Sequence, residues 1–340
     1  MTRFGFRYRA RRRVLAAGVL AAAVLAAAGC GGASGSASSS DGTVVLRVPD
    51  PGNSGVLARG KKDGSLAKAL SAVNTKVAWT GSTGPFAPAA QQINAGQLDF
   101  SQGSITSAIA ALGQKPGFKL FAQIAPDKAG EGILVRKDSP ISTVRDLIGR
   151  KVAVNKGGTA EYLLLKALEK EGVKPDQVKR VYLNPAETAP VFNSGQVDAW
   201  AVWAAYSVPE ISKGKARFLV NGDQVGSQNY SIWAVRTRFA EEHPKVVQAF
   251  YEYLRERGLQ QIKDPAAFIN VFTEAGPQAF NGAARELTIS NLRQGAAAAP
   301  IGAAQLADFD GVARFFADLK VTPAKVDVKP HVLSLAGSGA

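Results

Sequence analysis

Short apolar runs alternate along this chain with longer stretches in which apolar residues recur every three or four positions. The short runs predict buried strands, and the longer stretches predict helices with one buried face. The predicted strands are residues 44–48, 76–79, 98–101, 118–124, 131–136, 151–154, 178–183, 199–203, 218–220 and 231–235. The predicted helices are residues 56–73, 85–95, 104–112, 160–171 and 186–194, with further helices after residue 238. This alternation predicts an α/β fold with mainly parallel sheets, and we expect the C-terminal helices to pack back on the first part of the chain.

One short sequence motif occurs twice, each time between a predicted helix and a predicted strand. Residues 94–100 read Asn-Ala-Gly-Gln-Leu-Asp-Phe, and residues 193–199 read Asn-Ser-Gly-Gln-Val-Asp-Ala. Gly96 and Gly195 stand where a helix would end in a left-handed backbone conformation. A chance match is the alternative, because such corners are common in α/β proteins. The repeat predicts two similar α/β lobes, with a ligand cleft beyond the C-terminal ends of their strands.

The N-terminal 29 residues have the pattern of a targeting segment. Six arginines within the first 13 residues precede an uncharged apolar run at 14–29. This run is shorter than the roughly 20 residues that a membrane-spanning helix needs. We therefore predict a signal peptide at residues 1–29 and a Gly/Ser-rich tether at residues 30–43. The sequence Ala-Ala-Gly-Cys at 27–30 resembles a bacterial lipoprotein signal, which implies that Cys30 carries lipid; the alternative is an ordinary signal peptide with an incidental cysteine.

The net charge favours anionic partners only mildly. The chain has 41 basic and 27 acidic residues, and without the six signal-peptide arginines the excess falls to +8. Such an excess steers small anions toward the protein. No basic run is interleaved with aromatic residues, as a single-strand nucleic-acid site would require. We expect a small anionic solute and no nucleic acid.

Three predicted helices begin directly after a strand or loop with small polar residues. Helix N-termini bind anions through free backbone N–H groups and the helix dipole, without a formal countercharge. The residues at these three places are Asn53 with Ser54, Gly103 with Ser104, and Gly158 with Thr159. Simple capping is the alternative for each pair, because these residue types are preferred N-caps. We predict that the three pairs hold an anion.

Two aromatic residues follow the second copy of the repeat. Trp203 and Tyr206 are predicted to form a wall for the apolar tail of a ligand, with packing in the core as the alternative. Trp200 is predicted to point to the opposite face of the strand from Trp203.

No arrangement of residues in the sequence predicts catalysis. The two histidines, His243 and His331, have no neighbouring cysteine and no metal-ligand spacing. We expect no enzyme activity, no cofactor and no bound metal.

Several stretches carry a resemblance to a known family. They are residues 139–154, 156–159, 163–168, 195–203, 315–316 and 321–327. Together they resemble the solute-binding lipoproteins of ABC importers in the nitrate, taurine and alkanesulfonate group, most of all the aliphatic sulfonate-binding branch. The resemblance covers roughly residues 44–330. It implies a type II periplasmic-binding-protein fold, in which two crossover strands join two α/β lobes around a ligand cleft.

The resemblance also implies boundaries, partners and a location. Lobe 1 would comprise residues 44–123 and the return segment 230–340 with the C-terminal helices, and lobe 2 would comprise residues 130–225. The protein would act as a monomer that delivers an aliphatic sulfonate or related anion to ABC permease subunits outside the cytoplasm, anchored to the membrane by lipid. Nitrate, taurine or a pyrimidine precursor are alternative ligands, and a ligand-binding sensor is an alternative function.

The chain departs from the family after Trp203. Ala204 and Ala205 stand where the family usually has Asp-Pro. The missing carboxylate argues against taurine, whose amine would need an acidic partner.

Overall fold

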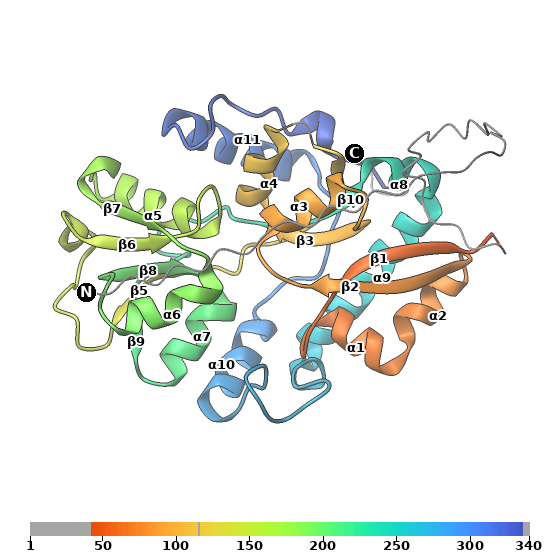
Figure 1. Ribbon diagram of the computed structural model, residues 1–340, viewed down its shortest axis with the longest axis horizontal. Coiled ribbons are helices and arrows are strands. Elements are labelled where there is room, and N and C mark those ends of the chain that lie inside the picture. The colour runs from red at the N-terminus through yellow and green to blue at the C-terminus, as the bar shows by residue number, and fades with distance from the viewer. Residues whose placement is uncertain (1–41, 115, 336–340) are drawn as a thin grey trace, which may run out of the picture. The chain divides into compact units, whose positions relative to one another are not determined.

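The computed structural model describes residues 42–114 and 116–335 (Figure 1). The predicted signal peptide, Cys30 and nearly all of the predicted tether lie outside the described residues. By its contacts the chain divides into Met1–Gly35 and Ser36–Ala340, and all the described residues belong to the second unit.

The described strands form three sheets. A parallel pair, β1–β2, and a three-stranded sheet in the order β3-β10-β4 belong to lobe 1. A five-stranded sheet in the order β7-β6-β8-β5-β9 belongs to lobe 2. The strands are β1 (Val44–Asp50), β2 (Thr75–Ser82), β3 (Phe100–Ser104), β4 (Phe118–Ile124), β5 (Gly132–Arg136), β6 (Lys151–Val154), β7 (Lys179–Tyr182), β8 (Ala199–Val202), β9 (Ala216–Asn221) and β10 (Ser231–Arg236).

Helices surround these sheets, and several connect consecutive strands (Figure 1). The helices are α1 (Val56–Asp63), α2 (Ser65–Ser71), α3 (Phe86–Asn94), α4 (Ile105–Leu112), α5 (Thr159–Lys170), α6 (Pro185–Asn193), α7 (Ala204–Ser212), α8 (Thr237–Glu242), α9 (Pro244–Lys263), α10 (Gly282–Arg293) and α11 (Ala303–Asp318). Single 3₁₀ turns occur at Val144–Leu147, Pro175–Gln177, Pro265–Phe268 and Lys329–His331. Of the C-terminal helices, α9 packs on α1 and α2, and α11 packs on α4, while α10 contacts both α9 and α7 of lobe 2.

The prediction of mainly parallel sheets is wrong. Strands β6, β7 and β8 are parallel, but β10 runs antiparallel to both β3 and β4, and β5 runs antiparallel to both β8 and β9. The reason is the connection between the lobes. Strand β5 arrives in lobe 2 from lobe 1 through residues 125–131, here called the first connection. Strand β10 returns to lobe 1 through residues 222–230, the second connection, and each arriving strand enters its sheet against the direction of its neighbours.

The repeated sequence motif folds the same way in both lobes, as predicted. Gly96 and Gly195 have φ values of 71° and 80° and end α3 and α6. The backbone amide of Asp99 donates to the carbonyl of Arg47 (2.9 Å), and the amide of Arg47 donates to the Asp99 carboxylate (2.9 Å). Asp198 makes the same two bonds with Lys151, both at 2.8 Å. In each lobe the repeated aspartate therefore ties the new strand to an earlier one.

The equivalence extends to the arriving strands. Phe100 pairs with Val235 of β10, and Ala199 pairs with Val135 of β5, one residue after each repeated aspartate. An arginine ends each arriving strand. Arg236 donates to the Asp99 carboxylate at 2.7 Å, and Arg136 donates to the carbonyls of Phe192 and Val197 at 3.1 and 2.8 Å. The two lobes thus repeat one arrangement of helix, corner, strand and arriving strand.

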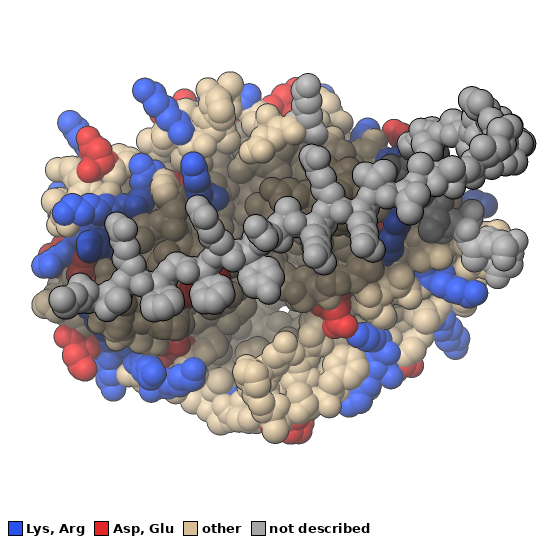
Figure 2. All heavy atoms as spheres, viewed as in Figure 1, with Lys and Arg blue, Asp and Glu red and all other residues tan. Residues whose placement is uncertain are grey.

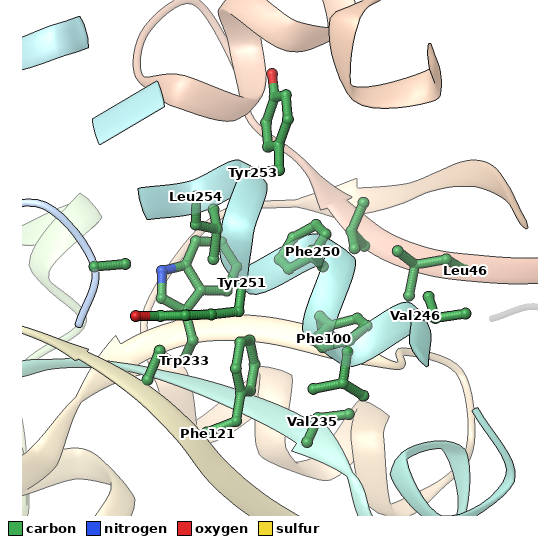
Figure 3. Close-up of a cluster of buried hydrophobic side chains, with 14 of the residues drawn as sticks. Leu46, Phe100, Phe121, Trp233, Val235, Val246, Phe250, Tyr251, Tyr253 and Leu254 are labelled. Carbon is green, nitrogen blue, oxygen red and sulfur yellow. The ribbon is translucent and has the colours of Figure 1, made fainter. Parts of the chain in front are cut away.

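Aromatic rings fill the core of lobe 1 between its sheets and α9 (Figure 3). Phe100 stacks on Phe250 with ring centres 4.6 Å apart and makes an edge contact with Phe121 at 5.3 Å. Trp233 meets Phe250 edge-on at 5.5 Å. Since Phe100 follows the repeated aspartate directly, this packing helps to fix the sheet edge that leads to α4.

Candidate functional site

The N-termini of α4 in lobe 1 and α5 in lobe 2 come together. A Cβ atom at Gly158, the N-cap of α5, would overlap the Asn155 side chain and lie 3.0 Å from the hydroxyl of Ser107 in α4. A Cβ at Gly157 would lie 3.1 Å from Ala110 of α4. Glycine at these positions therefore permits the close approach of the two lobes. Of the three predicted pairs, Gly158 with Thr159 lies at this junction, and the pair at 103–104 reaches it through Ser104, which bonds Ser107.

Ser104 is the N-cap of α4, which was the alternative explanation for this residue. Its hydroxyl accepts from the Ser107 amide at 3.3 Å and donates to the Ser107 hydroxyl at 3.0 Å, and the Thr106 hydroxyl oxygen lies 2.9 Å away. Gly103 has a packing role as well, since a Cβ there would overlap the buried ring of Phe86. Their contact with an anion stays a prediction.

Thr159 is the first residue of α5 and is bonded to the second connection. Its hydroxyl accepts a hydrogen bond from Nδ2 of Asn229 at 3.0 Å. Oδ1 of the same Asn229 accepts from the hydroxyl of Thr106 in α4 at 2.9 Å. Asn229, Thr159 and Thr106 are all buried. One asparagine side chain therefore joins the first turns of α4 and α5.

A buried carboxylate completes this network. Oε2 of Glu131, in the first connection, accepts from Nδ2 of Asn229 at 3.0 Å, and Oε1 accepts a short hydrogen bond from the Ser227 hydroxyl. Burial raises the pKa of Glu131 to about 7, although the hydrogen bonds from Ser227 and Asn229 oppose the rise. The backbone of the two connections is also joined, from the Gly222 amide to the Glu131 carbonyl at 2.8 Å.

Asn53 and Ser54 stand at the start of α1. The Asn53 side chain is buried and tied to a later loop: Oδ1 accepts from the amides of Phe272 and Thr273, and Nδ2 donates to the carbonyls of Thr273 and Gln278. Ser54 is partly exposed, and Gly55 is the N-cap of α1. Within the described chain, no hydrogen bond joins this pair to the other two pairs. Asn53 thus has a clear structural role, and its contact with a ligand is untested.

Trp203 lies at the N-cap of α7, a helix that the sequence analysis missed. Its half-buried ring meets Tyr206 edge-on at 5.0 Å, and Tyr206 also contacts the buried Trp200 at 6.0 Å. Burial raises the pKa of Tyr206. The prediction that Trp200 and Trp203 point to opposite faces of one strand is wrong, because β8 ends at Val202 and Trp203 already belongs to the start of α7. Both rings contact Tyr206.

The departure at Ala204 has a structural counterpart. A Cβ at Gly130 in the first connection would lie 2.8 Å from the Cβ of Ala204, and the Ser207 hydroxyl donates to the Gly130 carbonyl at 2.7 Å. The first turn of α7 therefore packs directly on the first connection.

Sequence reasoning missed Glu131, Asn229, Ser227 and Thr106. Glu131 and Asn229 lie 98 positions apart in the sequence. The available signal was weak: Glu131 is the first residue of a predicted strand, and Asn229 stands two residues before another.

On the face drawn in Figure 2, Lys and Arg side chains are spread over several parts and do not gather in one patch. Over the described ranges, no cluster of three or more His, Cys, Asp or Glu residues could hold a metal, and no helix is long and apolar enough to cross a membrane. Two cavities, of about 290 and 230 Å³, lie along the sides of α5 and α11, and Ser107, Gly158 and Thr159 line neither of them.

Known proteins resemble this chain in sequence and in fold. A putative aliphatic sulfonates-binding protein of Bacillus subtilis is 34% identical over 223 residues, which is 65% of this chain and 66% of that protein. The taurine-binding periplasmic protein of Escherichia coli is 37% identical over 151 residues, 44% of this chain and 46% of that protein. The chain thus matches about two thirds of the first relative's length and about half of the second's.

A solved structure covers more of the chain. The alkanesulfonate-binding protein SsuA of Xanthomonas axonopodis pv. citri, bound to MOPS, has a TM-score of 0.77 and 26% identity, over 85% of this chain and 98% of that one. This match confirms the predicted fold of two α/β lobes. The model of the family described as NMT1/THI5 like matches residues 83–267, which include all of lobe 2, both connections and the α4 N-terminus. The chain belongs to the NMT1/THI5-like family.

Proposed function

We propose that this protein is the extracytoplasmic solute-binding component of an ABC importer and that it binds an aliphatic sulfonate or a related small organic anion. The observation that carries the proposal is the meeting of the α4 and α5 N-termini, one from each lobe, with Ser107, Gly158 and Thr159 at the junction. The relatives described as sulfonate-binding support the choice of ligand.

The hydrogen-bond directions at the junction suit an anion. Nδ2 of Asn229 donates to Thr159, so the Thr159 hydroxyl keeps its own proton for another acceptor. Ser107 likewise accepts from the Ser104 hydroxyl and keeps its proton. A sulfonate is a monoanion that is hard to protonate, and such donors solvate it without a countercharge. Gly103, Ser104, Gly158 and Thr159 would contact the anion.

The other predicted residues would serve the remainder of the ligand. Asn53 and Ser54 would bound the site from lobe 1. Trp203 and Tyr206 would contact the tail, with indole and phenol groups at the edge of an apolar wall. The relative described as taurine-binding keeps taurine among the candidates, although Ala204 supplies no carboxylate.

The proposal includes the remaining expectations about the protein. It would bind and release its ligand without chemical change, act as a monomer, and deliver the ligand to permease subunits. Lipid on Cys30 would hold it at the outer face of the cell membrane. A sensor that binds the same ligand is the second candidate.

Calorimetry of the mature protein with methanesulfonate, octanesulfonate, taurine, nitrate and sulfate tests the proposal. We expect one sulfonate per protein, bound more tightly than nitrate and sulfate, and recovered unchanged as judged by NMR. Binding of none of these anions, or turnover of the ligand, would contradict it.

A further inference from the structure

Glu131 is held between the two connections, the segments through which the chain passes from one lobe to the other and back. Its side chain is 3% exposed and bonds Ser227 and Asn229 of the second connection. Its own backbone amide donates to the Asp127 carbonyl at 3.2 Å. Of the hydrogen-bond partners that the structure gives its carboxylate, neither is charged, so the negative charge is solvated by neutral donors alone.

The same carboxylate is close to the candidate anion site. Nδ2 of Asn229 lies 3.0 Å from Oε2 of Glu131 and 3.0 Å from Oγ1 of Thr159. Those two oxygens are therefore separated by no more than about 6 Å, and an anion bonded to Thr159 would lie within roughly 9 Å of the carboxylate.

We propose that Glu131 is a proton-binding residue coupled to the anion site, so that binding of a monoanion raises the proton occupancy of the Glu131 carboxylate. The inference rests on the proposed function, because it needs an anion beside Thr159. Two like charges in a buried region repel each other, and protonation of Glu131 removes the repulsion. The network survives this protonation, since Oε2 still accepts from Asn229 while the new O–H donates to Ser227.

The groups around Glu131 do not supply an alternative countercharge. Asp127 raises the pKa of Glu131 further. Lys128 of the same connection lowers this pKa, but its effect is smaller than those of burial, Ser227, Asn229 and Asp127. The second connection contributes Asp223, and α5 contributes Tyr162, whose own pKa burial raises to about 12. The pKa of Glu131 itself, about 7, places the proton exchange near neutral pH.

The size of the effect follows from the separation. At roughly 9 Å and an effective dielectric constant of about 20, repulsion between unit charges corresponds to roughly a 20-fold change in affinity. Allowing for screening, we expect sulfonate to bind on the order of tenfold more tightly at pH 5.5 than at pH 8.5. A tenfold change moves the pKa by about one unit, so at pH 7.5 binding should take up about half a proton.

Calorimetry with methanesulfonate at pH 7.5, in bis-Tris, imidazole and Tris buffers, tests the coupling. The buffering species are neutral amines and their cations, so none of them competes as an anion. The slope of binding enthalpy against buffer ionisation enthalpy gives the proton number. We expect about half a proton for the wild-type protein and none for Glu131→Gln, which should also bind with nearly constant affinity from pH 5.5 to 8.5.

Glu210→Gln is the matched control. Glu210 is also a buried carboxylate that accepts from an asparagine side chain, Asn193, but it belongs to α7, outside both connections. This variant should keep the wild-type proton number. Wild-type protein that binds methanesulfonate without taking up a proton would overturn the inference and leave the proposed function intact, whereas absence of binding would remove the proposed function first. Should Glu131→Gln fail to fold, the wild-type proton number and pH profile still decide.

Discussion

Replacement of Glu131 by glutamine should stabilise the ligand-free protein at alkaline pH. Glutamine keeps the size of the side chain; its carbonyl can accept from Asn229 while its amide donates to Ser227. The change therefore removes a buried charge and retains a bonded network. The stability gain should come from the charge alone.

The size of the gain follows from linkage between pKa and folding. The pKa of Glu131 is raised from 4.5 to about 7 on folding. Below about pH 4.5 both states hold the proton, and the carboxyl has no pH-linked effect. As the pH rises from 4.5 to 7 the unfolded chain ionises first, so the wild-type protein loses stability, and above pH 7 the loss is complete. At about 1.4 kcal/mol per pKa unit, the loss at pH 8 is on the order of 3 kcal/mol.

Urea unfolding of the mature protein at pH 5 and pH 8, followed by tryptophan fluorescence, measures this effect. We expect Glu131→Gln to exceed the wild type in free energy of unfolding by about 1–3 kcal/mol at pH 8, and by much less at pH 5, where the wild-type carboxyl is largely protonated. Glu210→Gln reports the general effect of exchanging a buried carboxylate for an amide. A Glu131→Gln protein that is less stable than the wild type by the same margin at both pH values would refute the reasoning, because it would show that hydrogen bonds to the ionised group outweigh its burial.

Three further changes test other parts of the structure. Asp99→Asn should lower the free energy of unfolding by about 3–5 kcal/mol, because it removes the carboxylate that pairs with the buried Arg236. Asp198→Asn at the equivalent position should lower it by only about 1 kcal/mol, and urea unfolding of both variants compares the two repeats. Trp203→Ala should weaken octanesulfonate by on the order of tenfold and methanesulfonate by much less, measured by calorimetry, and an equal loss for both would mean that Trp203 only supports the fold. Cys30→Ala should move the protein from the membrane fraction to the soluble fraction, and retention on the membrane after a high-salt wash would argue against the lipid anchor.

The sequence predicted most of the regular structure because local patterns determine it. Apolar runs located β4 and β6 to the residue, and the glycines of the repeat located the ends of α3 and α6. Helix α7 was missed because Trp203 and Tyr206 looked like the end of a strand, and its interior Pro209 gives no helical signal. The direction of β5 and β10 was missed because antiparallel insertion depends on the path between lobes, which no local pattern records.

The candidate site was predictable only in part. Small polar residues before helices pointed to Ser104, Gly158 and Thr159, since capping and anion binding use the same residue types. The Asn229–Glu131 network was not predictable, because its members come from two irregular segments that meet only after both lobes have formed. A hydroxyl can be assigned as a ligand donor only when its other bonds are known, and these bonds belong to tertiary structure.

The insertion of β10 between β3 and β4 has a consequence for the order of folding. Strands β3 and β4 do not pair with each other, because β10 lies between them. Their sheet therefore lacks its central strand until residues 231–236 have been synthesised, after the whole of lobe 2. The five strands of lobe 2 come from one uninterrupted stretch, residues 132–221. Lobe 2 can therefore fold as soon as residues 132–221 have been made, whereas β3 and β4 of lobe 1 lack their shared partner strand until residues 231–236 follow. The slow, aggregation-prone step in making this protein should be the closing of lobe 1 by its latest strand.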